Sequence, residues 1–288
     1  MNQFVSVKDA SHYLGVSSST FKRICEQHSI PLIRTLGGHR RIDRADLDHA
    51  YSLLWGRSQK KHSSTELSPV DSAKEMVEQL LDGNAQRVMS TLWARIDRLD
   101  ELSHTLESTL IAALWKIGEL WRTQEIDIYQ EHICSNTACT VLDMIMQRLP
   151  EIDGHAPLAI GGTFERIFDT IGTKILSVVL RSIGIRTIDL GCNLPAASIA
   201  KAAQELNASI VWICHTHVEN VDSLLANHQL LRKLLPSPVQ VMIGGGGLSP
   251  AMRRSLSDCL YFESISVMSE AMKQSLHSHS ATPVTSTQ

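Results

Sequence analysis

The sequence of 288 residues predicts three modules in a row: a winged helix-turn-helix domain, a four-helix bundle and an α/β domain with a doubly wound, parallel, five-stranded Rossmann-like sheet. Three observations predict this order. A glycine-containing hairpin with basic residues follows two short helices near the start. Helical periodicity fills the middle of the chain, and strand-like apolar runs alternate with helical stretches afterwards.

The first module, residues 1–56, is predicted to bind DNA. Residues 7–14 have apolar side chains at helical spacing, and the hydroxyl residues 17–20 offer N-caps for a second helix. Residues 34–41 (RTLGGHRR) predict a wing, which presents cations to a phosphate backbone. The DNA-contacting candidates are Ser18, Ser19, Thr20, Lys22, Arg23, Arg34, His39, Arg40 and Arg41.

Charge is distributed unevenly along the chain. Residues 1–61 contain ten Lys and Arg against five Asp and Glu, a balance of +5, so the remainder carries −8 of the total of −3. A basic head on an acidic body fits a nucleic-acid-binding module joined to a body that does not touch nucleic acid. No apolar run approaches the roughly twenty residues of a membrane span, and the six cysteines lack metal-site spacing. We therefore expect a cytoplasmic protein that binds double-stranded operator DNA and no membrane.

A polar linker is predicted at residues 57–69, followed by a helical bundle at residues 70–150. The four expected helices cover residues 71–81, 85–96, 100–121 and 128–149.

The α/β domain is predicted at residues 155–275, with a disordered tail at residues 276–288. Its expected strands cover residues 158–162, 186–190, 209–214, 239–243 and 259–265. The helices between them cover residues 172–183, 196–206, 221–235 and 250–257.

Ligands of such sheets bind at the carboxyl ends of the strands, so the loops there carry the candidate site. The loop after the first strand ends at Gly172, which opens a helix whose free N–H groups suit a polar ligand. The third strand ends near Cys214 and Thr216, and the fourth ends in four glycines, residues 244–247. Forty-one residues lie between Gly172 and Cys214, and twenty-seven between Thr216 and Gly244.

The wing resembles that of the MerR family, with Ile42 in place of an aromatic residue. The loops and their spacing resemble the cobalamin-binding module of methionine synthase, corrinoid proteins and mutases. From residue 1 to about 275, the order of modules resembles the light-responsive, cobalamin-dependent repressors of carotenoid synthesis. The resemblance implies a regulator, not an enzyme, that senses a tetrapyrrole, acts as a photoreceptor and controls operator binding as a homo-oligomer, a dimer or a tetramer.

The resemblance also implies how the chain's residues divide around a corrinoid. Trp121, Glu131 and His132 match the family's upper-face residues, and His132 is a candidate axial ligand. Asp169 stands in the loop that meets the lower face. The other cofactor-binding candidates are Gly172, Cys214, Thr216, Gly244, Gly245 and Gly246.

The sequence departs from the family at the cobalt ligands. Asp169 replaces the lower His, Ile167 replaces an Asp, Arg122 replaces the His that follows the Trp, and Cys214 replaces a Ser. A carboxylate is a poor substitute for imidazole on cobalt. Three options stay open: a cobalamin with its own base or water below, a bilin or haem in the same cleft, or no chromophore.

Two rival functions follow. A corrinoid methyl carrier of an enzyme explains the body but not the basic head, and a chromophore-free regulator would respond to oligomerisation or to a protein partner. His215 and His217 point the same way on an extended strand and could ligate a metal, but lone pairs of this kind more often form polar lining of the crevice.

Overall fold

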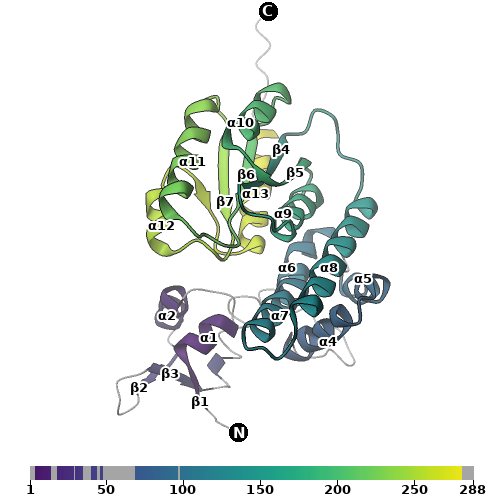
Figure 1. Cartoon of the computed structure of the whole chain (residues 1–288), viewed down its shortest axis with the longest axis vertical. Coiled ribbons are helices and arrows are strands. Elements are labelled where there is room, and N and C mark those ends of the chain that lie inside the picture. Colours follow the sequence, from purple (N-terminus) through teal and green to yellow (C-terminus); the bar gives the residue numbers. More distant parts are fainter. Residues whose placement is uncertain are drawn as a thin grey trace, which may run out of the picture. The chain divides into compact units, whose positions relative to one another are not determined.

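The computed structural model describes residues 4–13, 18–28, 30–34, 40–43, 46–47, 69–96 and 98–280. The chain divides into two compact units, residues 1–66 and 67–288 (Figure 1), and each is described by itself.

The first unit has the predicted helix-turn-helix and hairpin. Its elements are β1 (Phe4–Ser6), α1 (Val7–Tyr13), α2 (Ser18–Gln27), β2 (Ile33–Arg34) and β3 (Arg40–Asp43). The antiparallel sheet has the order β1-β3-β2, and the unpredicted β1 is too short for its sequence to show alternation. Ile42 is fully buried in a small core with Ala10, Phe21 and Cys25, so an aliphatic side chain serves where the family has an aromatic one.

Four helical segments of the second unit form the predicted bundle. They are α4 (Pro69–Leu81), α5 (Ala85–Trp93), a run of η1 (Leu99–Glu101), α6 (Leu102–Leu106), η2 (Glu107–Ile111) and α7 (Ala112–Arg122), and finally α8 (Ile128–Arg148). Asn84 caps α5 by accepting a hydrogen bond from the Arg87 N–H at 3.0 Å, and Asp127 with Gln130 forms a capping box at α8. The segment η2 is a single π turn inside an otherwise continuous helix.

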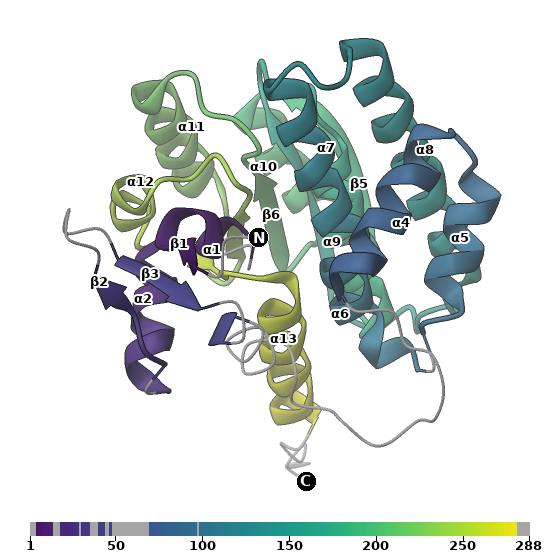
Figure 2. The ribbon, with the colours of Figure 1, turned by 90° about the horizontal axis from the view of Figure 1, so that it is seen from below.

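The rest of the second unit is the predicted parallel five-stranded sheet, with strand order β5-β4-β6-β7-β8. The strands are β4 (Leu158–Phe164), β5 (Arg186–Leu194), β6 (Ile210–Cys214), β7 (Gln240–Gly244) and β8 (Leu260–Tyr261). The helices that connect them are α9 (Ile171–Ser182), α10 (Ala196–Glu205), α11 (Val221–Leu234) and α12 (Pro250–Ser255). Figure 2 shows the bundle gathered on one side of the unit, beside α9.

The end of the described chain differs from the prediction. Strand β8 stops at Tyr261, and α13 (Ile265–Ser280) begins where the fifth strand was expected to continue. The helix passes residue 276, where a disordered tail was predicted, and residues 281–288 lie outside the described residues. The Glu107 carboxylate of η2 accepts a hydrogen bond from the Ser266 N–H at 3.2 Å, which ties the bundle to the first turn of α13. Among the described helices, none has the length and apolar character needed to cross a bilayer.

The bundle and one face of the sheet share a single hydrophobic core, while α10 and α11 close a second core on the other face. Trp212 of β6 is fully buried in the shared core, and its indole lies against Gly161 of β4. A Cβ added to Gly161 would lie 2.4 Å from the indole and 2.2 Å from the Trp212 carbonyl oxygen. The glycine is therefore required where these two strands meet.

Gly161→Ala is expected to lower the free energy of unfolding by about 1–3 kcal/mol, because the added methyl group forces the indole or the strand to move. Urea denaturation followed by circular dichroism measures the change. Gly154→Ala is the matched control, since a Cβ there meets nothing within 4 Å, and it should stay within about 0.5 kcal/mol of the parent. Equal midpoints for the two variants would contradict the expectation.

Candidate functional site

The basic candidates of the first unit lie on the two strands of the wing and on α2. Arg34 pairs with Arg40 across β2 and β3, and the Arg34 side chain is exposed. Arg41 is half-buried, and its Nη1 donates a hydrogen bond to the Phe4 carbonyl at 3.3 Å, so this cation also holds β3 to β1. Lys22 is half-buried and Arg23 exposed on α2.

The hydroxyl candidates on α2 have a mixed outcome. The Ser18 hydroxyl lies 2.8 Å from the Ser11 hydroxyl, so it already contributes to the packing of α1 on α2. The side chains of Ser19 and Thr20, and the whole of His39, lie outside the described residues.

In the second unit, the carboxyl edge of the sheet brings four of the predicted positions together. A Cβ added to Gly172 would lie 3.5 Å from Cys214 Sγ and 3.6 Å from Thr216 Cγ2. Cys214 is in register with Gly244 across β6 and β7. The predicted spacing therefore corresponds to real proximity at the start of α9 and the ends of these two strands.

Asp169 has a structural role of its own. Its Oδ1 accepts a hydrogen bond from the Ile171 N–H at 2.9 Å, which satisfies one free donor at the start of α9. The loop before it is fixed by Thr163, which donates to the Ile167 carbonyl at 2.7 Å, and by the Asn193 side chain, which accepts from the Arg166 N–H at 2.8 Å. The carboxylate is thus held at the helix end.

The glycines after β7 are mostly required by contacts within the chain. Gly245 has φ +109°, and a Cβ there would lie 2.3 Å from the His215 carbonyl oxygen. Gly247 donates its N–H to that same oxygen at 2.8 Å. A Cβ on Gly246 would lie 2.6 Å from Cη2 of Trp115, which comes from α7 of the bundle. Only at Gly244, among these four, would a Cβ meet nothing within 4 Å.

The upper-face candidates lie where α7 ends and α8 begins. Trp121 is 48% exposed and borders a hollow lined by the α7–α8 loop. The Glu131 carboxylate lies 2.6 Å from His132 Nδ1 and accepts a hydrogen bond from the Ser135 hydroxyl at 2.5 Å. Glu131 therefore orients the His132 ring, which is largely exposed.

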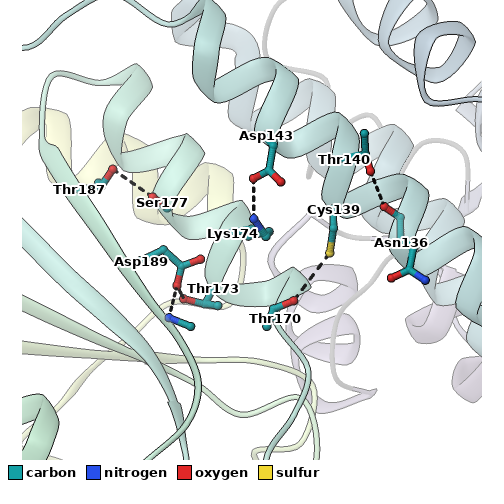
Figure 3. A network of polar contacts seen from close by, with 11 residues as sticks. Asn136, Cys139, Thr140, Asp143, Thr170, Thr173, Lys174, Ser177, Thr187 and Asp189 are labelled. Atoms are coloured by element: carbon teal, nitrogen blue, oxygen red, sulfur yellow. Dashed lines mark hydrogen bonds and ion pairs between the residues drawn. The ribbon is translucent and has the colours of Figure 1, made fainter.

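A polar network that the sequence did not reveal joins α8 to α9 (Figure 3). Lys174 Nζ pairs with Asp143 Oδ1 at 2.5 Å, and Cys139 Sγ lies 3.7 Å from the Thr170 hydroxyl. Thr170 immediately follows Asp169. The bundle is thus fastened beside the loop that was predicted to meet a ligand.

A buried histidine pair lies beneath the glycine loop. His215 Nε2 lies 2.8 Å from His228 Nε2 of α11. The ring of Phe164 packs edge-on against that of His228, with 4.9 Å between the two ring centroids. Burial lowers the pKa of His215 to about 3 and that of His228 to about 4. The expectation that His215 and His217 point the same way and line the crevice together is corrected, because His215 is buried whereas His217 is exposed.

The described residues suit a cobalamin only in part. At the edge that also holds Gly172 and Thr216, a Cβ at Gly244 would meet nothing within 4 Å, so a ligand can approach the backbone there. The residues on the lower face do not fit a cobalamin that needs a histidine ligand there. The carboxylate of Asp169 accepts the Ile171 N–H at the start of α9 and provides no neutral nitrogen. Within the described part of the chain, no group of three or more His, Cys, Asp or Glu could hold a metal ion by itself.

Comparisons with known families agree with this architecture. Residues 4–50 match the model of a helix-turn-helix domain, and residues 72–146, which cover most of the bundle, match the model of a B12 binding domain. The chain therefore combines a helix-turn-helix domain with a region that matches a B12 binding domain. This confirms the resemblance to regulators that combine these two parts.

Individual relatives include a transcriptional repressor and corrinoid proteins. The chain is 25% identical over 160 residues to the HTH-type transcriptional repressor CarH of Myxococcus xanthus, covering 52% of this chain and 51% of that protein. It is 23% identical over 195 residues to a dimethylamine corrinoid protein of Methanosarcina barkeri, covering 65% and 92%. The solved monomethylamine corrinoid protein of that organism has the same fold, with a TM-score of 0.59, 14% identity and coverage of 72% and 100%.

Acid should destabilise the second unit through the histidine pair. Both lowered pKa values mean that the folded state holds neutral rings, whereas the unfolded chain takes up protons near the ordinary value of 6.5. The contribution of the neutral pair to the free energy of unfolding should be fully present above pH 6.5. It should fall as the pH drops from there towards 4, by about 1.4 kcal/mol per pH unit for each histidine. Asp258 acts in the opposite direction on His228.

Urea denaturation at pH 7.5 and at 5 tests this. His228→Gln should be less stable at the higher pH yet lose less stability between the two, because one titrating group is gone. His155→Gln, at an exposed loop position, should keep the parent's pH dependence. A His228→Gln variant as acid-sensitive as the parent would show that the pair does not control the response.

Proposed function

We propose that this chain is a transcription regulator that binds operator DNA with its first unit and senses a tetrapyrrole with its second. The observation that supports this most is the union of a helix-turn-helix domain and a B12-binding domain in one chain. The similarity to a transcriptional repressor that spans part of both proteins points the same way. Arg34 and Arg40 would contact DNA phosphates from the wing, and Lys22 and Arg23 would approach from α2.

The tetrapyrrole would lie between the bundle and the carboxyl edge of the sheet. Trp121 and His132 would cover its upper face, with Glu131 holding the histidine ring in place. Gly172, Thr216 and Gly244 would border it from the sheet. When bound, a cobalamin would supply a cobalt ion that can exchange a ligand. The residues named here would hold and orient the macrocycle.

The lower face determines which tetrapyrrole is native. Because the Asp169 carboxylate is bonded to the start of α9, a cobalamin would keep its own base or a water as the ligand on its lower face. A bilin or haem would not need a histidine from this loop. Arg122 stands where a second histidine ligand would be needed, and it pairs with Glu119 at 3.5 Å. We therefore propose that light or ligand acts by changing the oligomer, not by trading an upper ligand for a second histidine.

Oligomerisation would couple the two units. One small winged head makes few phosphate contacts, so useful affinity needs two or four heads on repeated half-sites. The exposed apolar side chains of the bundle, among them Tyr129 and Ile133, are available for contacts between subunits.

A methyl-carrying corrinoid component is the second candidate, favoured by the similarity to dimethylamine corrinoid proteins over the bundle and sheet. The basic winged head and the loss of a nitrogen ligand at Asp169 favour the regulator instead. Specific DNA binding separates the two functions.

Arg40→Ala should weaken DNA binding at all sequences and reduce the dependence of log K on log salt by about one unit, because one phosphate contact is lost. Fluorescence anisotropy with labelled duplex at several salt concentrations measures both effects. Arg87→Ala is the control, since Arg87 is an exposed bundle residue paired with Asp82. Arg41→Ala is less suitable because Arg41 also supports β1. Unchanged affinity and salt slope for Arg40→Ala would contradict the wing assignment.

Asp169→His should bind hydroxocobalamin at least about tenfold more tightly than the parent, since an imidazole is a better ligand for cobalt than a carboxylate. Absorption titration measures affinity and the spectral change of His ligation, and light scattering in light and dark follows the oligomer. Asp169→Asn is the matched control because the amide oxygen can still cap α9 without offering a ring nitrogen. Titration with biliverdin and haemin identifies the alternatives. The tetrapyrrole function is refuted if neither the parent nor Asp169→His binds any of the three.

A further inference from the structure

Trp115 lies against the glycine loop at Gly246 but, unlike a core residue, keeps about half of its surface exposed. The ring edge meets Gly246 so closely that a Cβ there would lie 2.6 Å from Cη2 and 2.9 Å from Cζ2. Yet Trp115 is 51% exposed, whereas Trp212 in the core is fully buried. One part of the indole therefore rests on the loop while much of it remains open to solvent.

The helix α7 explains this position. Ala113 and Ile117 are buried in the bundle core, and each is two residues from Trp115, or about 200° around the helix. Trp115 thus lies on the opposite face. One turn further along that face, Gly118 has nothing within 4 Å of a built Cβ, so the surface beside the indole is open.

The loop beneath the indole has little other free backbone. Gly245 and Gly247 are packed against His215 and His217, which follow β6, and Gly244 faces open space. A group that extends from Gly244 along the loop therefore meets Trp115 at Gly246. It must either push the indole away or end before it.

We propose that Trp115 is the residue that determines specificity at this loop: it weakens the binding of a cobalamin whose nucleotide tail extends along the loop and favours a tetrapyrrole without that tail. This inference rests on the proposed tetrapyrrole function and specifies its substrate class. Under that proposed function the macrocycle would lie towards Trp121 and Asp169, so only an appendage that reaches Gly246 would compete with the indole. Displacing a half-buried indole gives up apolar contact, which weakens binding of the tailed ligand alone.

The test compares aquocobalamin with aquocobinamide, the same corrin without the nucleotide. Absorption titration of the full chain gives both dissociation constants, and their ratio is the readout. In the parent the ratio should favour cobinamide. Trp115→Ala should shift it towards cobalamin by about tenfold, a factor equivalent to about 1.4 kcal/mol, and Trp115→Phe should lie between.

Trp121→Ala is the matched control, because Trp121 is an equally exposed indole on the same helix that belongs to the upper face. It should weaken both ligands alike and leave their ratio unchanged. Circular dichroism and denaturation midpoints verify that each variant is folded.

The outcomes are distinct. If both corrinoids bind and Trp115→Ala leaves the ratio unaltered, the role of Trp115 is overturned while the tetrapyrrole function stands. If neither corrinoid binds the parent or any variant, this inference is overturned as well, and the biliverdin and haemin titrations decide whether the broader function survives.

Discussion

The buried side chain of Trp212 fixes the geometry on which the second unit depends. Its indole fills the space that Gly161 leaves open on β4, and its Nε1 donates a hydrogen bond to the Thr173 hydroxyl of α9 at 2.8 Å. Thr173 in turn donates to Asp189 of β5 at 2.8 Å. One residue therefore links three neighbouring strands to a helix. Trp212 also belongs to the core that the sheet shares with the bundle.

The loops at the carboxyl edge inherit their positions from this core. Helix α9 is held from inside by Thr173 and from outside by the ion pair of Lys174 with Asp143. Its first turn therefore has little freedom, and the same holds for Gly172 where it meets Cys214. A ligand would find these groups already arranged, so binding would lose little free energy to reordering. Greater freedom is expected on the bundle side, where Trp121 and His132 are exposed.

Sequence reasoning reached the architecture because strong periodic signals encode it. The strand cores and the four bundle helices were predictable from apolar spacing, and Gly172 with Cys214 from the interval between them. Other features depend on contacts between distant segments, which no local pattern reports. Nothing in the sequence near Gly246 indicates that its neighbour is Trp115, and nothing near His215 indicates His228. Asp169 was recognised as a lost ligand, but its role as a helix cap required the backbone geometry.

The π turn η2 has a consequence for the whole of α7. Each α-helical residue advances the chain by about 100° around the axis, and a π turn accommodates an extra residue without adding a full turn. The residues after Ile111 are therefore rotated, by about the angle of one residue, from where an uninterrupted α-helix continuing α6 would place them. In this phase Ile117 faces the core and Trp115 faces Gly246, while Glu107 is aimed at the start of α13. Winding the same residues as a regular α-helix, with none removed, would turn α7 by about the angle of one residue and carry Trp115 away from Gly246, whereas deleting one residue within η2 would keep α7 in its present phase. The contact of Trp115 with the glycine loop thus depends on one extra residue that the π turn accommodates in a helix wound elsewhere at the ordinary pitch.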